Sequence, residues 1–119
     1  MSLDISLRSA TPVETTCNCC GSSIDYYETH FEANITHNLV PMAKEAGLYD
    51  YLWGTSGKYA KDISWELYTG LTKLRAYPSV YKRLDAANGW GKYEDFVRFV
   101  DEVYEATVKY PDAEIIRWS

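Results

Sequence analysis

The chain lacks the features that mark several classes of protein. Its 119 residues hold no apolar run near the length of a membrane span and no basic and apolar N-terminal leader of a signal peptide. Lysine and arginine number 12 against 17 aspartates and glutamates, giving a net charge of −5 without a basic stripe. Extended nucleic-acid surfaces need clustered cations. We therefore expect no membrane insertion, no extended nucleic-acid partner and a location in the cytoplasm.

Cysteine and histidine are scarce, which limits metal and redox chemistry. The three cysteines are Cys17, Cys19 and Cys20, an odd number that does not make a disulfide framework. Residues 17–21 do contain a C-x-x-C followed by glycine, the pattern of a zinc knuckle, although a second knuckle is missing. With the two histidines, Cys17, Cys20, His30 and His37 could form one tetrahedral zinc site. The alternative is three reduced cysteines in a turn, with no cofactor.

The motifs of common catalytic sites are also missing. The chain has no G-x-S-x-G, no phosphate-cradling glycine loop and no H-E-x-x-H. The adjacent Glu94 and Asp95 would point in different directions on a helix and are better explained as favourable charges in its first turn. His37 acting with a carboxylate, or a Cys–His pair, would lack any recognisable frame. We therefore expect a binding protein and not an enzyme.

Aromatic residues, in contrast, are abundant. Eleven tyrosines and four tryptophans exceed what a small core usually needs. Tyrosine and tryptophan combine a large contact area with a polar group, and a surplus of them often lines an interface or a stacking pocket. A helical core built from large side chains is the other explanation, and the sequence leaves both open.

The pattern of apolar residues predicts one α+β domain over residues 1–119. Alternation over residues 3–9 predicts a strand, which Pro12 and the Thr/Glu run after it should end before a cysteine-rich turn closes residues 1–23. Residues 24–119 should form a helical core that ends in a strand over 113–118, with a further strand or extended loop at 24–35. The N- and C-terminal strands are expected to pair in a small antiparallel sheet packed against about three helices.

Three helical segments account for most of the expected core. Asn38 is the predicted N-cap of the first, with Pro41 in its first turn and Gly47 at its end, before a short helical piece at 48–53. The second should run from about 58 to 76, with Gly70 at a close approach of helices, and the third from 92 to 109. The expected core stripes are Tyr59, Ile63, Leu67, Leu71 and Leu74 in the second helix and Phe96, Val97, Val100, Tyr104 and Val108 in the third.

Two polar segments precede helices and suggest a recognition surface. They are Asn34-Ile35-Thr36-His37-Asn38-Leu39 and Asn88-Gly89-Trp90-Gly91-Lys92-Tyr93. Backbone N–H groups at a helix entrance are free to bind a ligand. The predicted ligand-binding residues are Asn34, Thr36, His37, Asn38, Trp90, Lys92 and Tyr93. The alternative is that these residues only cap helices and fix turns, with Trp90 buried as a plug.

In the binding interpretation, aromatic rings would stack a planar ligand and cations would meet its phosphate. The rings are Trp90, Tyr93, Tyr26 and Tyr27, and the cation is Lys92 or Arg83. The sequence does not show whether the segments at 34–38 and 88–93 meet in space.

The two motifs N-I-T-H-N-L and N-G-W-G-x-Y-E, with the Tyr110-Pro111-Asp112-Ala113 junction, resemble those of a family of small bacteriophage and prophage proteins. The resemblance covers roughly residues 24–117 and implies a setting in the host cell without naming an activity. By analogy with other small phage proteins, it implies a non-enzymatic binding protein that could sequester a small anionic, nucleotide-like host-defence signal. The alternative is a protein-interaction or structural module, zinc-stabilised or homo-oligomeric, that inhibits a host protein.

Overall fold

The structure is a computed structural model, and it describes residues 2–9, 13–16, 21, 23–85, 89 and 91–119. Its elements in chain order are β1 (Ser2–Arg8), β2 (Val13–Thr16), β3 (Ser23–Tyr26), β4 (Thr29–Thr36), the 3-10 helix η1 (His37–Leu39), α1 (Val40–Glu45), α2 (Tyr49–Leu52), the 3-10 helix η2 (Ala60–Asp62), α3 (Ser64–Ala76), α4 (Pro78–Lys82), α5 (Tyr93–Lys109) and β5 (Glu114–Trp118). None of the described helices is long and apolar enough to cross a membrane.

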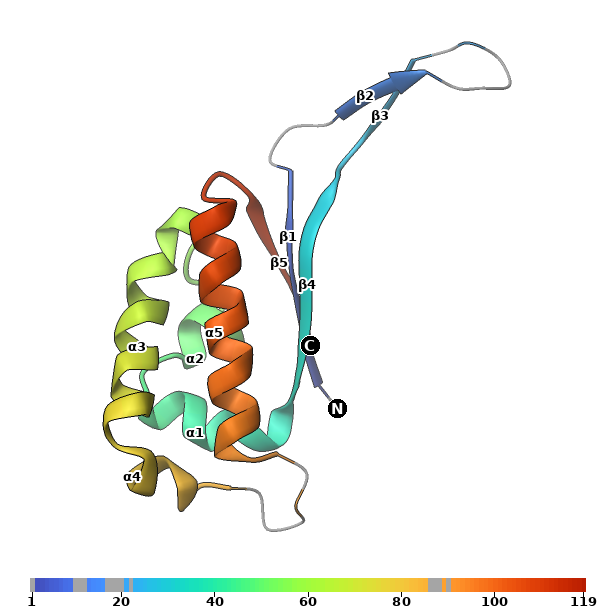
Figure 1. Cartoon of the computed structure of the whole chain (residues 1–119). Coiled ribbons are helices and arrows are strands. Elements are labelled where there is room, and N and C mark those ends of the chain that lie inside the picture. Colours follow the sequence, from blue (N-terminus) through green and yellow to red (C-terminus); the bar gives the residue numbers. More distant parts are fainter. Residues whose placement is uncertain (1, 10–12, 17–20, 22, 86–88, 90) are drawn as a thin grey trace.

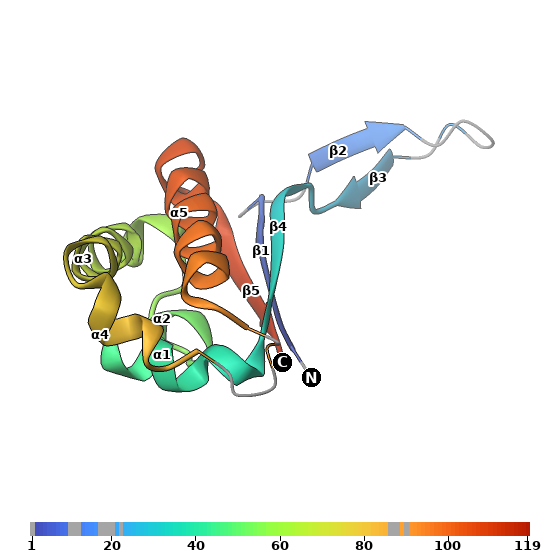
Figure 2. The ribbon, with the colours of Figure 1, turned by 60° about the horizontal axis from the view of Figure 1, so that its bottom comes forward.

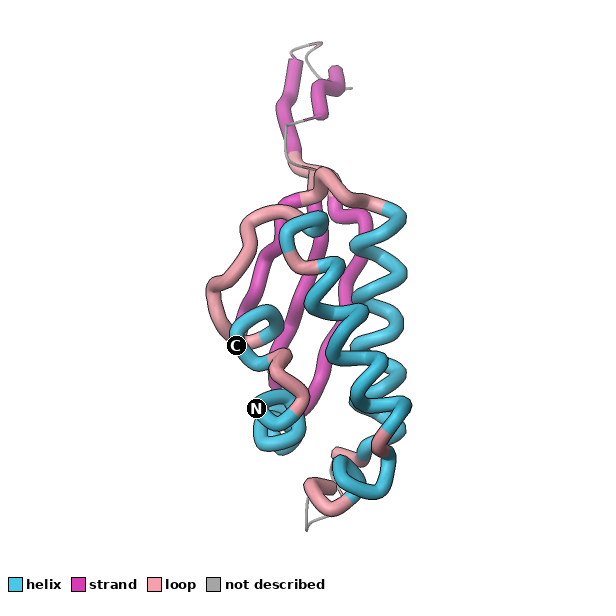
Figure 3. The backbone as a smooth tube through the Cα atoms, turned by 90° about the vertical axis from the view of Figure 1, so that its left-hand side faces the viewer, coloured by secondary structure: helices cyan, strands magenta, loops and turns pink. Residues whose placement is uncertain are grey.

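A three-stranded antiparallel sheet with strand order β4-β1-β5 carries the helices on one face (Figures 1 and 3). The expected α+β fold, with its first and last strands paired, is confirmed. Leu3, Ile5 and Leu7 of β1 are buried toward the helices, while the residues between them alternate to the open face. The period-2 pattern of the sequence therefore placed this strand correctly.

Strands β2 and β3 form a separate antiparallel hairpin that extends away from the sheet and helices (Figures 1 and 2). The longest dimension of the molecule, 58 Å against 29 and 20 Å, reflects this projection. The first strand ends at Arg8, before Pro12 and the Thr/Glu run, but Val13–Thr16 also pairs with Ser23–Tyr26 in a further strand that was not predicted. Cys17 to Cys20, which come between these two strands in the sequence, lie outside the described residues, so the predicted cysteine-rich turn stays a prediction.

The core between sheet and helices is built mainly by α3 and α5. The predicted stripe of Ile63, Leu67, Leu71 and Leu74 is fully buried or nearly so. On α5 the stripe is rotated from the expected one. Val108 is 55% exposed, whereas the core side chains are Phe96, Phe99, Val100, Val103 and Ala106. These residues follow the three- and four-residue spacing of a single helix face, which turns toward β4.

Two predictions about where helices start are wrong, and in each case the observed hydrogen bonds explain the difference. The helix expected from residue 58 begins at Ser64, because Ala60 N–H donates to Ala113 O and Ile115 N–H to Lys58 O, 2.8 Å each. These bonds place the 58–60 segment beside β5. At the first helix, the 3-10 helix η1 precedes α1. The Thr36 hydroxyl accepts the Asn38 N–H at 3.3 Å and caps η1, while Leu39 is the N-cap of α1, so Asn38 caps neither helix.

Candidate functional site

The two polar segments singled out in the sequence meet at the start of α5. Gly91 adopts a φ of +131°, and a Cβ atom there would lie 3.0 Å from Thr36 Cγ2 and 3.1 Å from Leu39 Cγ. Glycine allows this backbone to approach η1 closely, since it has no side chain to clash and tolerates positive φ. Gly91 of the second segment and Thr36 of the first, which are 55 positions apart, are thus brought together in space.

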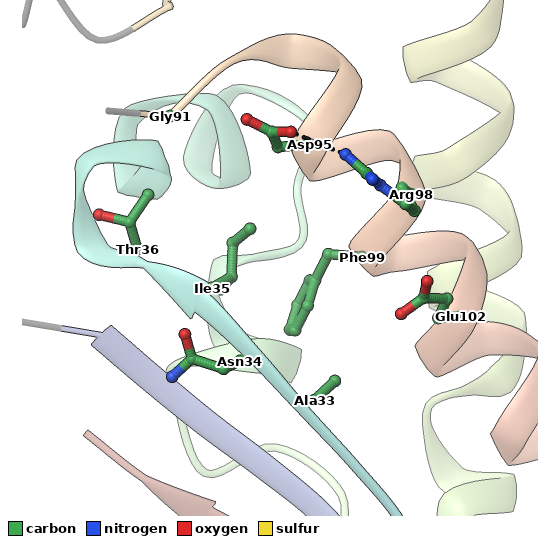
Figure 4. A pocket seen from close by; sticks show the side chains of 9 residues that line it. All are labelled: Ala33, Asn34, Ile35, Thr36, Gly91, Asp95, Arg98, Phe99 and Glu102. Carbon is green, nitrogen blue, oxygen red and sulfur yellow. Dashed lines mark hydrogen bonds and ion pairs between the residues drawn. The ribbon is translucent and has the colours of Figure 1, made fainter. Parts of the chain in front are cut away.

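A groove of about 420 Å³ opens where these segments meet, between the end of β4 and the first turns of α5 (Figure 4). We call it the edge groove, and its lining residues are Ala33, Asn34, Ile35, Thr36, Gly91, Asp95, Arg98, Phe99 and Glu102. Ile35 and Phe99 lie between the strand and the helix at its floor, whereas the polar side chains lie on its rim.

The polar side chains on the strand side of the edge groove form hydrogen bonds with neighbouring residues of the chain. The Asn34 amide turns to the open face of the sheet and donates to Ser2 Oγ at 2.9 Å and Asp4 Oδ1 at 2.7 Å. Thr36 holds the N-terminus of η1 through its hydroxyl. A ligand here would therefore meet mainly the backbone of β4, not free side-chain donors.

Carboxylates dominate the helix side. Asp95 accepts from Arg98 Nη2 at 2.8 Å and from its own helix's Lys92 N–H at 3.3 Å, which makes it the first-turn charge that the sequence predicts. The Tyr93 N–H donates to Asp85 Oδ1 at 2.7 Å. The N–H groups of Lys92 and Tyr93 at the entrance of α5 are thus bound to carboxylates, and a phosphate binding these two groups would have to displace the carboxylates.

The remaining predicted site residues do not line the edge groove. Tyr93 is buried and its hydroxyl donates to Leu74 O at 2.6 Å, which anchors α5 to α3. The His37 ring meets Trp53 edge-on at 6.1 Å, and its Nε2 is buried without a hydrogen-bond partner among the described residues. The Asn38 N–H donates to the Thr36 hydroxyl, and Lys92 and Arg83 are exposed. The Tyr27 ring packs against the Arg8 guanidinium. Trp90 and the Tyr26 side chain lie outside the described part.

The proposed zinc ligands are not assembled as one set. His30 lies at the start of β4, where its ring stacks on Tyr110 at 4.6 Å, and His37 follows the end of the same strand. Seven residues of extended chain separate the two histidines by roughly 23 Å. Zinc binds nitrogen at about 2 Å, so both cannot ligate one ion. Within the described ranges, no three His, Cys, Asp or Glu side chains are grouped to hold a metal.

This separation makes a sharp prediction for the cysteine turn, which itself stays untested. If purified protein carries zinc, the Cys17→Ser and Cys20→Ser variants should each lose it, because one knuckle needs both thiolates. At least one of His30→Ala and His37→Ala should keep full zinc content in plasma mass spectrometry. Loss of zinc in both histidine variants would contradict the extended β4 described above.

The sequence analysis missed the residues that α5 contributes to the edge groove. Asp95, Arg98 and Glu102 follow one another at spacings of three and four and so share a helix face. That spacing was readable from the sequence. Its position beside β4 was not, because it depends on how α5 packs on the sheet.

A second group of exposed side chains lies on the opposite side of α5 and accounts for part of the aromatic surplus. Trp65, 70% exposed, stacks on Tyr68 at 5.8 Å between ring centroids, and Tyr68 contacts Tyr104 at the same distance. These rings line a shallow hollow of about 480 Å³ between α3 and α5. The surplus is therefore divided between core anchors such as Tyr93 and surface rings.

Comparison with known proteins gives no match for this chain. No family model matches the chain, and no curated protein or solved structure matches it either, so the geometry of the groove carries the functional argument alone.

Proposed function

We propose that the chain is a non-enzymatic binding protein that recognises a partner protein through the edge groove. The observation that supports this proposal is the groove at the edge of the sheet, in which residues 34–36 of the first segment and Gly91 of the second lie together. If the resemblance to phage proteins holds, the partner is a protein of the host cell, whose activity the bound chain would inhibit.

A protein partner fits the groove better than a nucleotide-like signal does. Arg98, the cation that lines the edge groove, is paired with Asp95, and Glu102 adds a further negative charge. Two carboxylates already accept the N–H groups of Lys92 and Tyr93. Like charges placed against a phosphate lower its affinity. A hydrogen-bonding backbone edge above an apolar floor suits a polypeptide instead.

Site-specific photo-crosslinking tests this proposal. A benzophenone amino acid replaces Glu102, which is exposed on the groove, and in a matched control it replaces Lys73, which is exposed on α3 outside the groove. In bacterial lysate we expect the label at 102 to capture a defined protein in 1:1 ratio and the label at 73 to capture none. Equal capture at both positions would place the interface elsewhere.

The same preparation tests the nucleotide alternative. Native mass spectrometry of freshly purified protein should give the mass of the chain without a co-purified small molecule. A retained nucleotide, released on denaturation and lost in the Gly91→Val variant, would overturn the protein partner and favour the host-defence signal as ligand.

A further inference from the structure

We infer that the partner contributes an extended segment rich in lysine or arginine, which pairs with β4 as a fourth strand of the sheet. This inference rests on the proposed function and names the chemistry of its partner. Strand addition joins the backbones of two proteins through ladder hydrogen bonds, while pockets for alternate side chains supply specificity.

The first support is the open edge of β4. In the described part of the chain β4 pairs with β1 alone, so its other side presents unpaired N–H and C=O groups. The eight residues Thr29–Thr36 include no lysine or proline, the residues that often protect an edge strand. The opposite edge of the sheet differs, because the segment at Lys58–Ala60 covers β5 with two backbone hydrogen bonds of 2.8 Å.

The second support is the match between β4 and α5. The helix runs antiparallel to the strand and is fastened to it at both ends, by Gly91 against Thr36 and by the stacked rings of Tyr110 and His30. Eight residues of strand and 17 of helix each span about 26 Å. A second hollow, of about 480 Å³, continues the edge groove toward the end of α5 and shares Glu102 with it. An extended segment of about seven residues would fill this channel.

The third support is the charge of the helix wall. Asp95 is paired with Arg98, and Asp101 with Arg75 at 3.4 Å. Glu102 and Glu105 line the channel without an ion pair or hydrogen bond to any described residue. Lys109 also lines this end of the channel without an ion pair, with its Nζ 5.4 Å from the centroid of the Tyr110 ring. Two carboxylates against one cation leave the unneutralised charge facing an incoming strand net negative, which favours a basic segment.

The same charges disfavour a second copy of this chain as the occupant. Two β4 edges paired about a twofold axis would bring both copies of the unpaired Glu102 and Glu105 to one interface. Like charges brought together in this way cost binding energy. The basic partner is consequently the occupant to which we commit.

Peptide binding tests the inference directly. A fluorescent seven-residue peptide alternating lysine and valine should bind at low salt, and its glutamate counterpart should not. Alternate N–H groups of an extended peptide point to opposite sides. N-methylation of the set that faces β4 should abolish binding, whereas N-methylation of the set that points away from β4 should leave the affinity unchanged. Bound peptide should slow hydrogen exchange at alternate amides within residues 31–36, because the new ladder protects them.

Charge reversal supplies the matched variants. Glu102→Arg should weaken binding of the lysine peptide roughly tenfold. Glu45→Arg changes the net charge equally at an exposed site on α1 outside the channel, and it should bind as the unmodified protein does.

The outcomes separate this inference from the proposed function. Crosslinking at 102 together with no peptide binding, or with binding insensitive to N-methylation, would overturn strand addition and leave the protein partner standing. If sedimentation shows a dimer and hydrogen exchange shows that β4 is protected in it, a second copy of the chain occupies this edge, and the basic partner is overturned. Failure of both the crosslink and the peptide would overturn both proposals.

Discussion

Replacing Arg117 with methionine is expected to lower the free energy of unfolding by about 3 kcal/mol, because its charged guanidinium donates to three backbone carbonyls and its bonds to Tyr51 and Gly57 are partly buried. Its guanidinium donates from Nε and Nη2 to Tyr51 O at 3.2 and 2.9 Å, from Nη2 to Ser56 O at 2.7 Å and from Nη1 to Gly57 O at 3.3 Å. Burial lowers the pKa of Arg117, yet the group stays charged at any physiological pH. The side chain thus ties the 51–57 segment to the last strand.

Urea unfolding followed by circular dichroism measures this effect. Arg98→Met is the matched control, because it removes an arginine whose bond to Asp95 is exposed and is worth at most about 1 kcal/mol. Arg117→Lys should recover only part of the loss, since one ammonium cannot reach three carbonyls in the geometry of the guanidinium fork. Equal stability of Arg117→Met and Arg98→Met would show that the clamp contributes little.

Replacing Gly70 with alanine should also destabilise the protein, by about 2 kcal/mol, although alanine favours helices. A Cβ at this position would lie 2.4 to 2.7 Å from three carbons of the Leu48 side chain, which is fully buried. Overpacking of this kind costs more than the ~1 kcal/mol gained in helix propensity. Thr72→Ala, on the exposed side of α3, should change stability by less than about 0.5 kcal/mol.

A double-mutant cycle identifies the cause. Leu48→Ala alone should cost about 3 kcal/mol by opening a cavity. In the Gly70→Ala, Leu48→Ala protein the new methyl group enters that cavity, so the combined loss should fall short of the sum by at least about 1 kcal/mol. Strict additivity would mean that the clash with Leu48 is not what Gly70 avoids.

The sequence predicted the elements that depend on local periodicity. The stripe on α3, the strand at each end, the left-handed Gly47 and the end of α3 before Pro78 all follow from short-range patterns. Gly70 was also expected at a close approach, although the contact is the Leu48 side chain and not a second long helix.

Long-range hydrogen bonding limited the remaining predictions. Tyr59 continued the α3 stripe in the sequence, but its backbone bridges to Glu114, 55 positions away. The sequence carried no prediction for Arg117, because its carbonyl partners at Tyr51, Ser56 and Gly57 are about 60 positions away. For the candidate site, Asn34 and Thr36 of the predicted ligand-binding residues line the edge groove, and their binding of a ligand stays a prediction. The wall formed by Asp95 and Glu102 required the packing of α5 on β4.

The order of strands also determines when this protein can complete its fold. Among the described strands the central β1 is synthesised before the others and its partner β5 after them, and the pair Asp4–Trp118 joins residues 114 positions apart. Until β5 leaves the ribosome, β1 has one open edge and the apolar side chains of a nascent sheet remain incompletely covered. Such non-local pairing slows folding, so truncated or stalled chains that end before β5 should be prone to aggregate.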